Sequence, residues 1–267
     1  MNVTEIILQR RSVRTYTGKS LDFVTVQKIK DYIASLKPPF GAKCRIVLTN
    51  TSASTEPVKL GTYGFVKGAT DYLALLIEGD DALAEEGAAY MFEQVILYCT
   101  SLGLGTCWLG GSFNRSDFNK RLTLRPGEKI RIVAPVGYAS DKRHLSLLSV
   151  LSSSKPKPRK PFTANFFHTR FGDPLTEDAA GIYARPLEMV RMAPSANNTQ
   201  SWRVVMGESA LHFYKSASFG FDRIDLGIAL CHFEQTCLEL GIAGHYEVLG
   251  NAPEGKKADY VISWVEL

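Results

Sequence analysis

The sequence has no Cys-x-x-Cys pair, no long apolar run and no strong excess of charge of either sign. Its apolar runs stay below the roughly 18 residues that a membrane-spanning helix needs. Charged residues also interrupt the start, MNVTEIILQRRSVR, where a secretory signal would be apolar. The 31 Lys and Arg against 27 Asp and Glu leave a net charge of +4, which is too small for a nucleic-acid-binding surface. These absences predict a cytoplasmic protein that binds neither membranes nor nucleic acids.

The cysteines and histidines lack the spacing of metal ligands. The five cysteines form an odd set without paired spacing, which favours reduced thiols in a reducing compartment over disulfides or zinc sites. Cys231 and Cys237 fall on different sides of an expected helix, so a redox pair is not predicted. No metal is predicted, and the histidines are expected at the surface or hydrogen-bonded in the core; they are His144, His168, His212, His232 and His245.

What is present is the composition of a globular protein. With 267 residues, 45% of them hydrophobic, the chain can form one large domain or two small ones. Apolar stripes and cap residues predict helices over about 2–10, 22–36, 82–102, 116–122, 180–192 and 225–240. Strands are expected over about 44–49, 72–78, 129–138, 203–206, 210–214 and 259–265, with a short strand and turn over 106–111. The mixture predicts an α+β fold.

A stretch rich in serine, proline and lysine divides the chain. Residues 146–162, SLLSVLSSSKPKPRKPF, show no periodicity and have the composition of an extended connector. We therefore predict a first half over 1–150, a linker over 151–165 and a shorter second half over 166–267. The basic run KPKPRK is interpreted as a solvated part of the linker rather than as an electrostatic arm, and it is assigned no function.

The two halves contain similar stretches of sequence. EQVILYCTSLGLGTCW in the first half corresponds to HFEQTCLELGIAGHYEV in the second, with Leu102-Gly103 matched by Leu240-Gly241. In each half, a helix ending at a proline-containing loop precedes a strand, a long amphipathic helix and another strand. Any two α+β halves share some of this order, but the similarity favours an internal duplication.

An arginine-rich segment, RRSVRTY over residues 10–16, follows the first expected helix. Arginine side chains can bind phosphate oxygens in a bidentate manner, and a serine hydroxyl with nearby backbone N–H groups can complete a dianion site. By itself the cluster is also compatible with a solvated, basic surface.

Two further segments are candidates for contact with a flat ligand. In PSANNTQSW (194–202), a dense run of polar side chains precedes a strand. Such a run could bind a planar ligand with polar edges, or it could simply form a turn. In LGLGTCWLGG (102–111), the first glycines end a helix, and Gly110 and Gly111 either allow the backbone to approach a flat ligand closely or form a bare turn.

Taken together and in this order, the three segments resemble the signature elements of the FMN-dependent nitroreductase family. Those elements are an N-terminal RRSxRxY cluster, a GLGxxW stretch after the long central helix and an APSxxNxQPW loop. In the ordinary family one chain carries all three, and a homodimer builds two flavin sites at its interface. Here RRSVRTY and LGLGTCWLGG lie in the first half, whereas APSANNTQSW lies in the second.

The resemblance therefore implies a tandem subgroup with two related halves. The first half has KPPFGAKC where a polar loop is expected, and the second has no arginine cluster in GIYARPLEMVRM. One chain would fold as a pseudo-dimer around mixed or antiparallel sheets and keep a single FMN site between its halves. The protein is then expected to be a monomer or a weak homodimer.

The resemblance also assigns the cofactor contacts. Arg10 and Ser12 would hold the flavin phosphate, with Lys142 and Arg143 as a late basic pair beside them. Arg11 would fix the cluster on the cofactor, and Arg14 would reach the pyrimidine edge of the ring. Contacts along the ring and past its N5 atom would come from Leu109, Gly110, Gly111, Pro194, Ser195, Ala196 and Asn198.

Two details of this assignment concern neighbouring residues. Ser201 replaces the family's proline, which loosens the loop backbone but removes no assigned contact. The segment around Tyr63 and Lys67 is a candidate for covering the site.

The implied activity is hydride transfer from NADH or NADPH to a small electron-poor acceptor such as a nitroaromatic or a quinone, with ping-pong kinetics. The cofactor would carry the electrons, so no catalytic side chain is assigned. The alternatives are a flavin-storage or flavin-sensing protein without turnover, a specialised flavin reductase such as a dehalogenase, and a scaffold that binds no cofactor.

Overall fold

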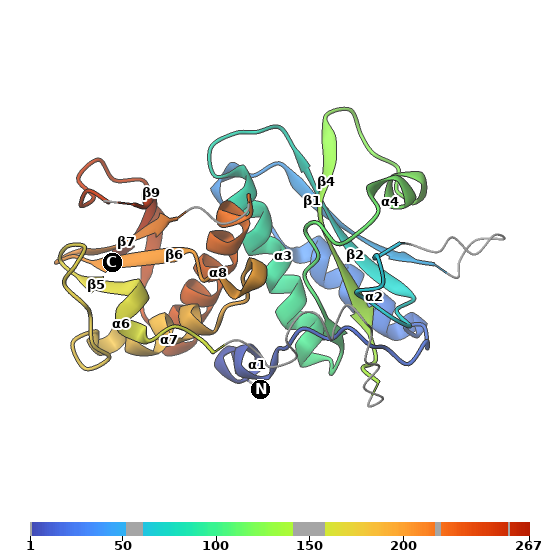
Figure 1. Ribbon diagram of the computed structural model, residues 1–267, viewed down its shortest axis with the longest axis horizontal. Helices are drawn as coiled ribbons and strands as arrows, with labels where there is room; N and C mark the ends of the chain where they lie inside the picture. Colours follow the sequence, from blue (N-terminus) through green and yellow to red (C-terminus); the bar gives the residue numbers. More distant parts are fainter. Residues whose placement is uncertain (1, 52–60, 141–157, 217–219, 256) are drawn as a thin grey trace. The chain divides into compact units, whose positions relative to one another are not determined.

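A computed structural model describes residues 2–51, 61–140, 158–216, 220–255 and 257–267. Contacts divide the chain into two compact units, Gln9–Pro156 and a second unit made of Met1–Leu8 with Lys157–Leu267. They are called the N-terminal and C-terminal units below, and each is described by itself. Both contain a β-sheet and helices (Figure 1), which confirms the α+β class.

The N-terminal unit contains a four-stranded antiparallel sheet in the order β1-β2-β4-β3. Its elements are α2 (Phe23–Ser35), η1 (Pro39–Gly41), β1 (Cys44–Asn50), β2 (Asp71–Glu78), α3 (Ala84–Ser101), β3 (Gly105–Thr106), α4 (Arg115–Arg121) and β4 (Glu128–Gly137). Strand β2 is the near-continuous apolar run DYLALLIE, and it is buried up to its last residue. That composition is typical of a strand with a neighbour on each side and both faces covered. Helix α3 packs against β1 and β2.

The C-terminal unit contains a five-stranded sheet in the order β5-β6-β7-β9-β8, in which only the β5–β6 pair is parallel. Its elements are α1 (Val3–Gln9), α6 (Phe162–Asn165), β5 (Phe166–His168), η2 (Gly181–Tyr183), α7 (Ala184–Met192), η3 (Ala196–Asn198), β6 (Trp202–Met206), β7 (Ala210–Lys215), α8 (Asp222–Leu240), β8 (Gly244–Glu247) and β9 (Asp259–Glu266). Helix α8 packs against β6, β7 and α7.

The two units share a topology. In each, a helix and a short 3-10 turn lead into two antiparallel strands, a long helix and two further strands, and the spatial orders β1-β2-β4-β3 and β6-β7-β9-β8 correspond. Each central pair also has one register shift, between Leu75 and Leu76 in β2 and between Phe213 and Tyr214 in β7. The middle residue of each 3-10 turn is left-handed, with φ 59° at Phe40 and 51° at Asn197. An internal duplication predicts this correspondence.

Local signals in the sequence locate the main helices correctly. Asn2 and Glu5 form the expected capping box, in which the Glu5 N–H donates to Asn2 Oδ1 at 2.9 Å and the Asn2 N–H to Glu5 Oε2 at 3.3 Å. The side chain of Asp22 accepts from the Thr25 N–H at 2.8 Å and begins α2. Glycines at 103 and 241, both with positive φ, follow α3 and α8.

The connector and the first helix differ from expectation. Of the linker predicted over 151–165, residues 151–157 lie outside the described residues, and Phe162–Asn165 form helix α6 with Phe162 buried. The predicted first half begins at residue 1, but α1 contacts the C-terminal unit, where the Thr4 N–H and hydroxyl both donate to the Glu239 carboxylate at 2.9 Å. Strands β5 and β8 are not predicted from the sequence because they are short and lack a clear apolar period.

Within the described ranges, no helix is both long and apolar enough to cross a membrane. In the same part of the chain, no group of three or more His, Cys, Asp or Glu side chains could hold a metal ion. Each of the five cysteines is a free thiol. His212 and His232 are core histidines as predicted, with Nδ1 at 2.8 Å from Ser263 Oγ and 2.9 Å from the Met189 carbonyl oxygen, respectively.

Candidate functional site

The arginine-rich segment of the N-terminal unit runs beside strand β3. Ser12 forms a parallel bridge with Thr106, and the Val13 N–H donates to the Thr106 carbonyl at 2.8 Å. This approach requires a glycine at position 105, because a Cβ there would lie 2.7 Å from Val13 Cγ2. Gly105 therefore lets RRSVRTY and GLGTCW lie side by side.

Arg10 is the most unusual member of the cluster. Its Nε and Nη1 atoms are buried and have no hydrogen-bond partner among the residues that the structure describes. Leaving a buried donor unpaired costs about 1–3 kcal/mol, more for a charged group. Arg11, Ser12 and Arg14 are exposed. A partly buried cation with free donors beside three exposed polar groups fits an anionic ligand such as a phosphate.

Cys107 shows how closely the cluster is gathered. Burial raises the pKa of its thiol, while Arg14, the Ser12 hydroxyl and Arg10 act in the opposite direction. All three cluster side chains are therefore near the same sulfur atom. Cys107 as a whole is 3% exposed, so it packs behind the cluster rather than facing solvent.

A second segment lies along the other side of residues 14–16. The Lys67 N–H donates to the Arg14 carbonyl and the Tyr16 N–H to the Lys67 carbonyl, both at 2.9 Å. In the turn before Lys67, Tyr63 is exposed, and its backbone is left-handed with φ 48°. Lys67 is thus beside the arginine cluster, and a covering role for Tyr63 and Lys67 stays a prediction.

Residues 109–111, which lie a few residues after β3, are held by hydrogen bonds at Leu109 and lie open at Gly111. Leu109 is buried and exchanges two backbone hydrogen bonds with Val133, at 2.9 and 3.0 Å. A Cβ on Gly111 would meet no atom within 4 Å, so space for a ligand is open there. Sequence reasoning missed Glu93, a buried carboxylate on α3 that accepts from Trp108 Nε1 at 2.8 Å and so fixes the residue before Leu109.

The polar loop of the C-terminal unit, residues 193–202, closes on its own side chains. Ser195 Oγ accepts from the Gln200 N–H at 2.9 Å, and the Ser195 carbonyl accepts from the Asn198 N–H at 3.0 Å. Asn197, Asn198 and Gln200 all have positive φ, between 48° and 58°. Much of the polar content that suggested a ligand therefore also stabilises the loop.

Asp225, in the first turn of α8, is a site residue that sequence reasoning missed. Its buried carboxylate accepts from the Ala196 N–H at 2.9 Å and lies 3.3 Å from Ser201 Oγ and 3.4 Å from Thr199 Oγ1. The available signal was an acidic residue on the otherwise apolar face of IDLGIALCHF. A buried carboxylate of this kind needs several donors, and the loop provides them.

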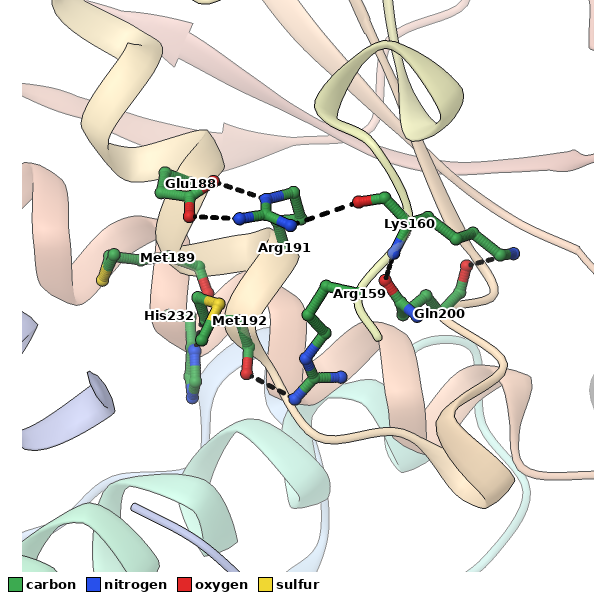
Figure 2. Close-up of polar contacts among 8 residues, drawn as sticks. All are labelled: Arg159, Lys160, Glu188, Met189, Arg191, Met192, Gln200 and His232. Carbon is green, nitrogen blue, oxygen red and sulfur yellow. Dashed lines mark hydrogen bonds and ion pairs between the residues drawn. The ribbon is translucent and has the colours of Figure 1, made fainter. Parts of the chain in front are cut away.

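The basic end of the connector also binds this loop and the end of α7; Figure 2 shows Lys160 bound to Gln200 and Arg159 bound to the Met192 carbonyl. Arg159 Nη1 donates to Asn198 Oδ1 at 2.6 Å, and Nη2 donates to the Met192 carbonyl at 2.8 Å. The Lys160 N–H donates to Gln200 Oε1 at 2.8 Å, and its Nζ donates to the Thr199 carbonyl at 2.7 Å. The interpretation of KPKPRK as a solvated linker is therefore wrong for these two residues.

Several cations lie close to the loop. Arg203 Nη1 donates to the carbonyls of Gln200 and Trp202, at 3.0 and 2.6 Å. Burial lowers the pKa of Arg203, and burial together with the nearby charge of Arg203 lowers the pKa of Lys160. Arg191 differs, because its bidentate pair with Glu188 raises its pKa (Figure 2).

A family model described as "Putative TM nitroreductase" matches residues 2–237. The chain belongs to this family. The match extends across both units of the chain, which confirms the resemblance drawn from the three sequence segments. No curated protein sequence matches this one.

Solved structures show the nitroreductase fold. A "putative nitroreductase" from Thermotoga maritima is 20% identical, with a TM-score of 0.60, and the alignment covers 100% of this chain and 94% of that one. An oxidoreductase containing FMN is 18% identical, with a TM-score of 0.52 over 63% of this chain and 92% of its own. A Bacteroides fragilis nitroreductase with bound FMN is 19% identical, with a TM-score of 0.42 over 55% and 92%.

The structure of this nitroreductase-family chain groups the predicted site residues into two sets. Arg10, Arg11, Ser12, Arg14, Leu109, Gly110 and Gly111 lie in the N-terminal unit, and Pro194, Ser195, Ala196 and Asn198 lie in the C-terminal unit. Lys142 and Arg143 are outside the described residues. A single site that combines both sets stays a prediction.

Proposed function

We propose that this protein is an FMN-dependent oxidoreductase that transfers hydride from NADH or NADPH to a small electron-poor acceptor, such as a nitroaromatic or a quinone. Membership of the nitroreductase family supports the reaction class. FMN is present in some of the structures with this fold, and it is the cofactor we propose here. The acceptor class follows from the same resemblance.

The observation that carries the proposal is the pair of unpaired, buried guanidinium nitrogens of Arg10. A flavin phosphate would supply the acceptors that these donors lack, and the exposed Ser12 hydroxyl and Arg11 guanidinium beside them would complete the anion site. Lys142 and Arg143 are proposed to contribute further positive charge. The donor set fits a phosphate group.

FMN held by Arg10, Arg11 and Ser12 would supply the hydride-transfer chemistry, so the protein needs no nucleophile of its own. Its residues supply position and charge. Arg14, which is exposed beside the phosphate-binding residues, is proposed to face the pyrimidine edge of the ring and to stabilise the negative charge that reduction places there.

The remaining contacts are proposed to come from both units. The backbone of Leu109, Gly110 and Gly111 would pass the reactive edge, and Pro194, Ser195, Ala196 and Asn198 would pack along the ring. This requires the two units to form one site as an intramolecular pseudo-dimer. The family model reaches into both units, and the Thermotoga structure aligns over the full length of this chain, as the proposal requires. We propose a cytoplasmic monomer or weak homodimer.

The visible spectrum tests the proposal directly. The purified protein, or the protein after incubation with FMN, should have the yellow absorption of bound flavin, and anaerobic NADH or NADPH should bleach it. Re-oxidation by a nitroaromatic or quinone should then restore the colour. A bound flavin that neither nicotinamide bleaches would instead indicate a storage or sensor protein, and a protein that binds no FMN would contradict the proposal.

Arg14→Ala separates charge stabilisation from cofactor binding. We expect turnover to fall about tenfold or more, because the guanidinium would no longer stabilise the reduced ring, while the FMN dissociation constant changes less. Steady-state kinetics and fluorescence titration with FMN measure the two quantities. Full turnover in this variant would rule out the assigned role of Arg14.

A further inference from the structure

The loop over residues 195–200 has an unusual backbone for its sequence. Asn197, Asn198 and Gln200 are left-handed with φ of 51°, 58° and 48°, a region that residues other than glycine adopt at a cost in free energy, which is smaller for asparagine than for most residues. Such a backbone persists only where the surroundings hold it. The contacts that hold this loop should therefore reveal why the strain is kept.

The N-terminal unit shows that the turn itself does not need these residues. Its equivalent turn has Phe40 and Gly41 at the two left-handed positions, with φ of 59° and 66°. Glycine adopts that conformation without strain. Asn198 stands where this turn has Gly41, so the C-terminal unit accepts strain in order to place an amide side chain at that position.

Both ends of the Asn198 amide are bound by the connector. Arg159 Nη1 donates to Oδ1 at 2.6 Å, and Nδ2 donates to the Pro158 carbonyl at 3.2 Å. Through its other terminal nitrogen, Arg159 also donates to the Met192 carbonyl at the end of α7 (Figure 2). One guanidinium thus joins the end of the helix to the side chain of the loop and fixes the orientation of the amide.

Lys160 supports the same loop from the next position. Its backbone N–H holds the Gln200 side chain and its Nζ holds the Thr199 carbonyl. Arg191 in turn donates to the Lys160 carbonyl at 3.2 Å (Figure 2). The connector is therefore anchored to α7 as well as to the loop, and it can transmit the position of the helix to residues 198–200.

We propose that Arg159, assisted by Lys160, is a positioning residue for flavin binding: it fixes the Asn198 amide and the 195–200 loop in the conformation that receives the edge of the cofactor. This inference rests on the proposed function. It assigns a role to the connector that composition alone did not suggest, and it makes Arg159 act through Asn198 rather than by touching the flavin.

A double-mutant cycle tests this coupling in the full-length protein. The variants are Arg159→Ala, Asn198→Gly and the double variant, with FMN dissociation constants measured by fluorescence titration. Glycine at 198 keeps the left-handed backbone and removes only the amide. We expect Arg159→Ala to weaken FMN binding about tenfold. The double variant should bind FMN as tightly as whichever single variant binds it less tightly, because the two residues act as a unit.

Two further variants give the comparison its controls. Arg185→Ala removes an exposed positive charge from α7 and should leave FMN affinity unchanged. Arg159→Lys keeps the charge but cannot span Asn198 and Met192 with a fork of two nitrogens, so it should recover binding in part. The visible absorption band of the bound flavin should shift in Arg159→Ala and not in Arg185→Ala.

Hydrogen exchange of the flavin-free protein decides whether the loop is held by Arg159. Peptides covering 193–203 should exchange faster in Arg159→Ala than in Arg185→Ala. Unchanged exchange, unchanged FMN affinity, or additive losses in the cycle would each overturn the inference. If the wild-type protein bound no FMN, the proposed function would fail first, whatever the variants showed, and the inference would fail with it.

Discussion

The two units contain the same turn before their first paired strand, but they stabilise it by different means. In the N-terminal unit, Pro39 packs directly onto Gly87 of α3, where an added Cβ would lie 2.5 Å from the Pro39 carbonyl oxygen. In the C-terminal unit, Asp225 is at the same position of α8, the fourth residue, and its carboxylate binds the loop. The first turn is thus held by close packing, and the second by hydrogen bonds to a buried carboxylate.

A second difference concerns the strand that follows the long helix. In the N-terminal unit, Gly105 lets the arginine-rich segment pair with β3. In the C-terminal unit, a Cβ on Gly244 would instead lie 2.5 Å from the Trp264 ring, so the glycine there serves the core. The equivalent glycines of the shared topology therefore serve different contacts in the two units.

Exchanging the residue types at the equivalent helix positions should give the largest effect. We expect Gly87→Asp to destabilise the protein by about 3–4 kcal/mol, because neither the Cβ nor the carboxylate has room beside Pro39 and Ala42. Urea unfolding measures the change. Gly250→Asp is the matched control, since a Cβ there meets no atom within 4 Å; equal losses in both variants would show that the close packing at Gly87 is unimportant.

The converse change, Asp225→Ala, should cost about 2–3 kcal/mol. It leaves the half-buried Ala196 N–H and the buried Ser201 hydroxyl without their shared acceptor. Asp225→Asn keeps an acceptor oxygen and should lose about half as much. Thermal unfolding of the two variants provides the measurement, and a fully stable Asp225→Ala protein would contradict the role given to this carboxylate.

Acid should weaken an ion pair that belongs to the N-terminal unit. Hydrogen bonds from Arg45 lower the pKa of Glu128 from 4.5 to about 2. Because the folded-state pKa is below the unfolded one, the stabilisation is present above pH 4.5 and is lost as the pH falls towards 2. The stability difference between wild type and Glu128→Gln, about 1 kcal/mol at neutral pH, should therefore shrink over this range.

Asp259→Asn in the C-terminal unit serves as the control for that pH series. Asp259 pairs with Lys215 at 3.0 Å, but its side chain is 79% exposed. Such a pair contributes little to stability. A pH-dependent difference as large as that of Glu128→Gln would show that the effect does not come from the part-buried Arg45–Glu128 pair.

Local sequence patterns predicted most of the fold. Asn2 and Asp22 begin helices because their side chains accept hydrogen bonds from residues three positions away. The apolar run at 72–78 predicted a central strand, because a strand that is covered on both faces needs apolar side chains on both of them. The position of helix α1 was not predictable in this way, since it depends on the contact of Thr4 with Glu239.

The candidate site was likewise predictable from the sequence only in part. Residue types and their order identified the arginine cluster, the glycine stretch and the polar loop, because phosphate binding and close backbone approach need particular side chains. Only the tertiary structure shows three further features: the unpaired donors of Arg10, the Asp225 carboxylate that binds the loop, and the hydrogen bond from Arg159 to Asn198. Hydrogen bonds between residues distant in the chain have no period in the sequence, and only the folded backbone brings their partners within reach.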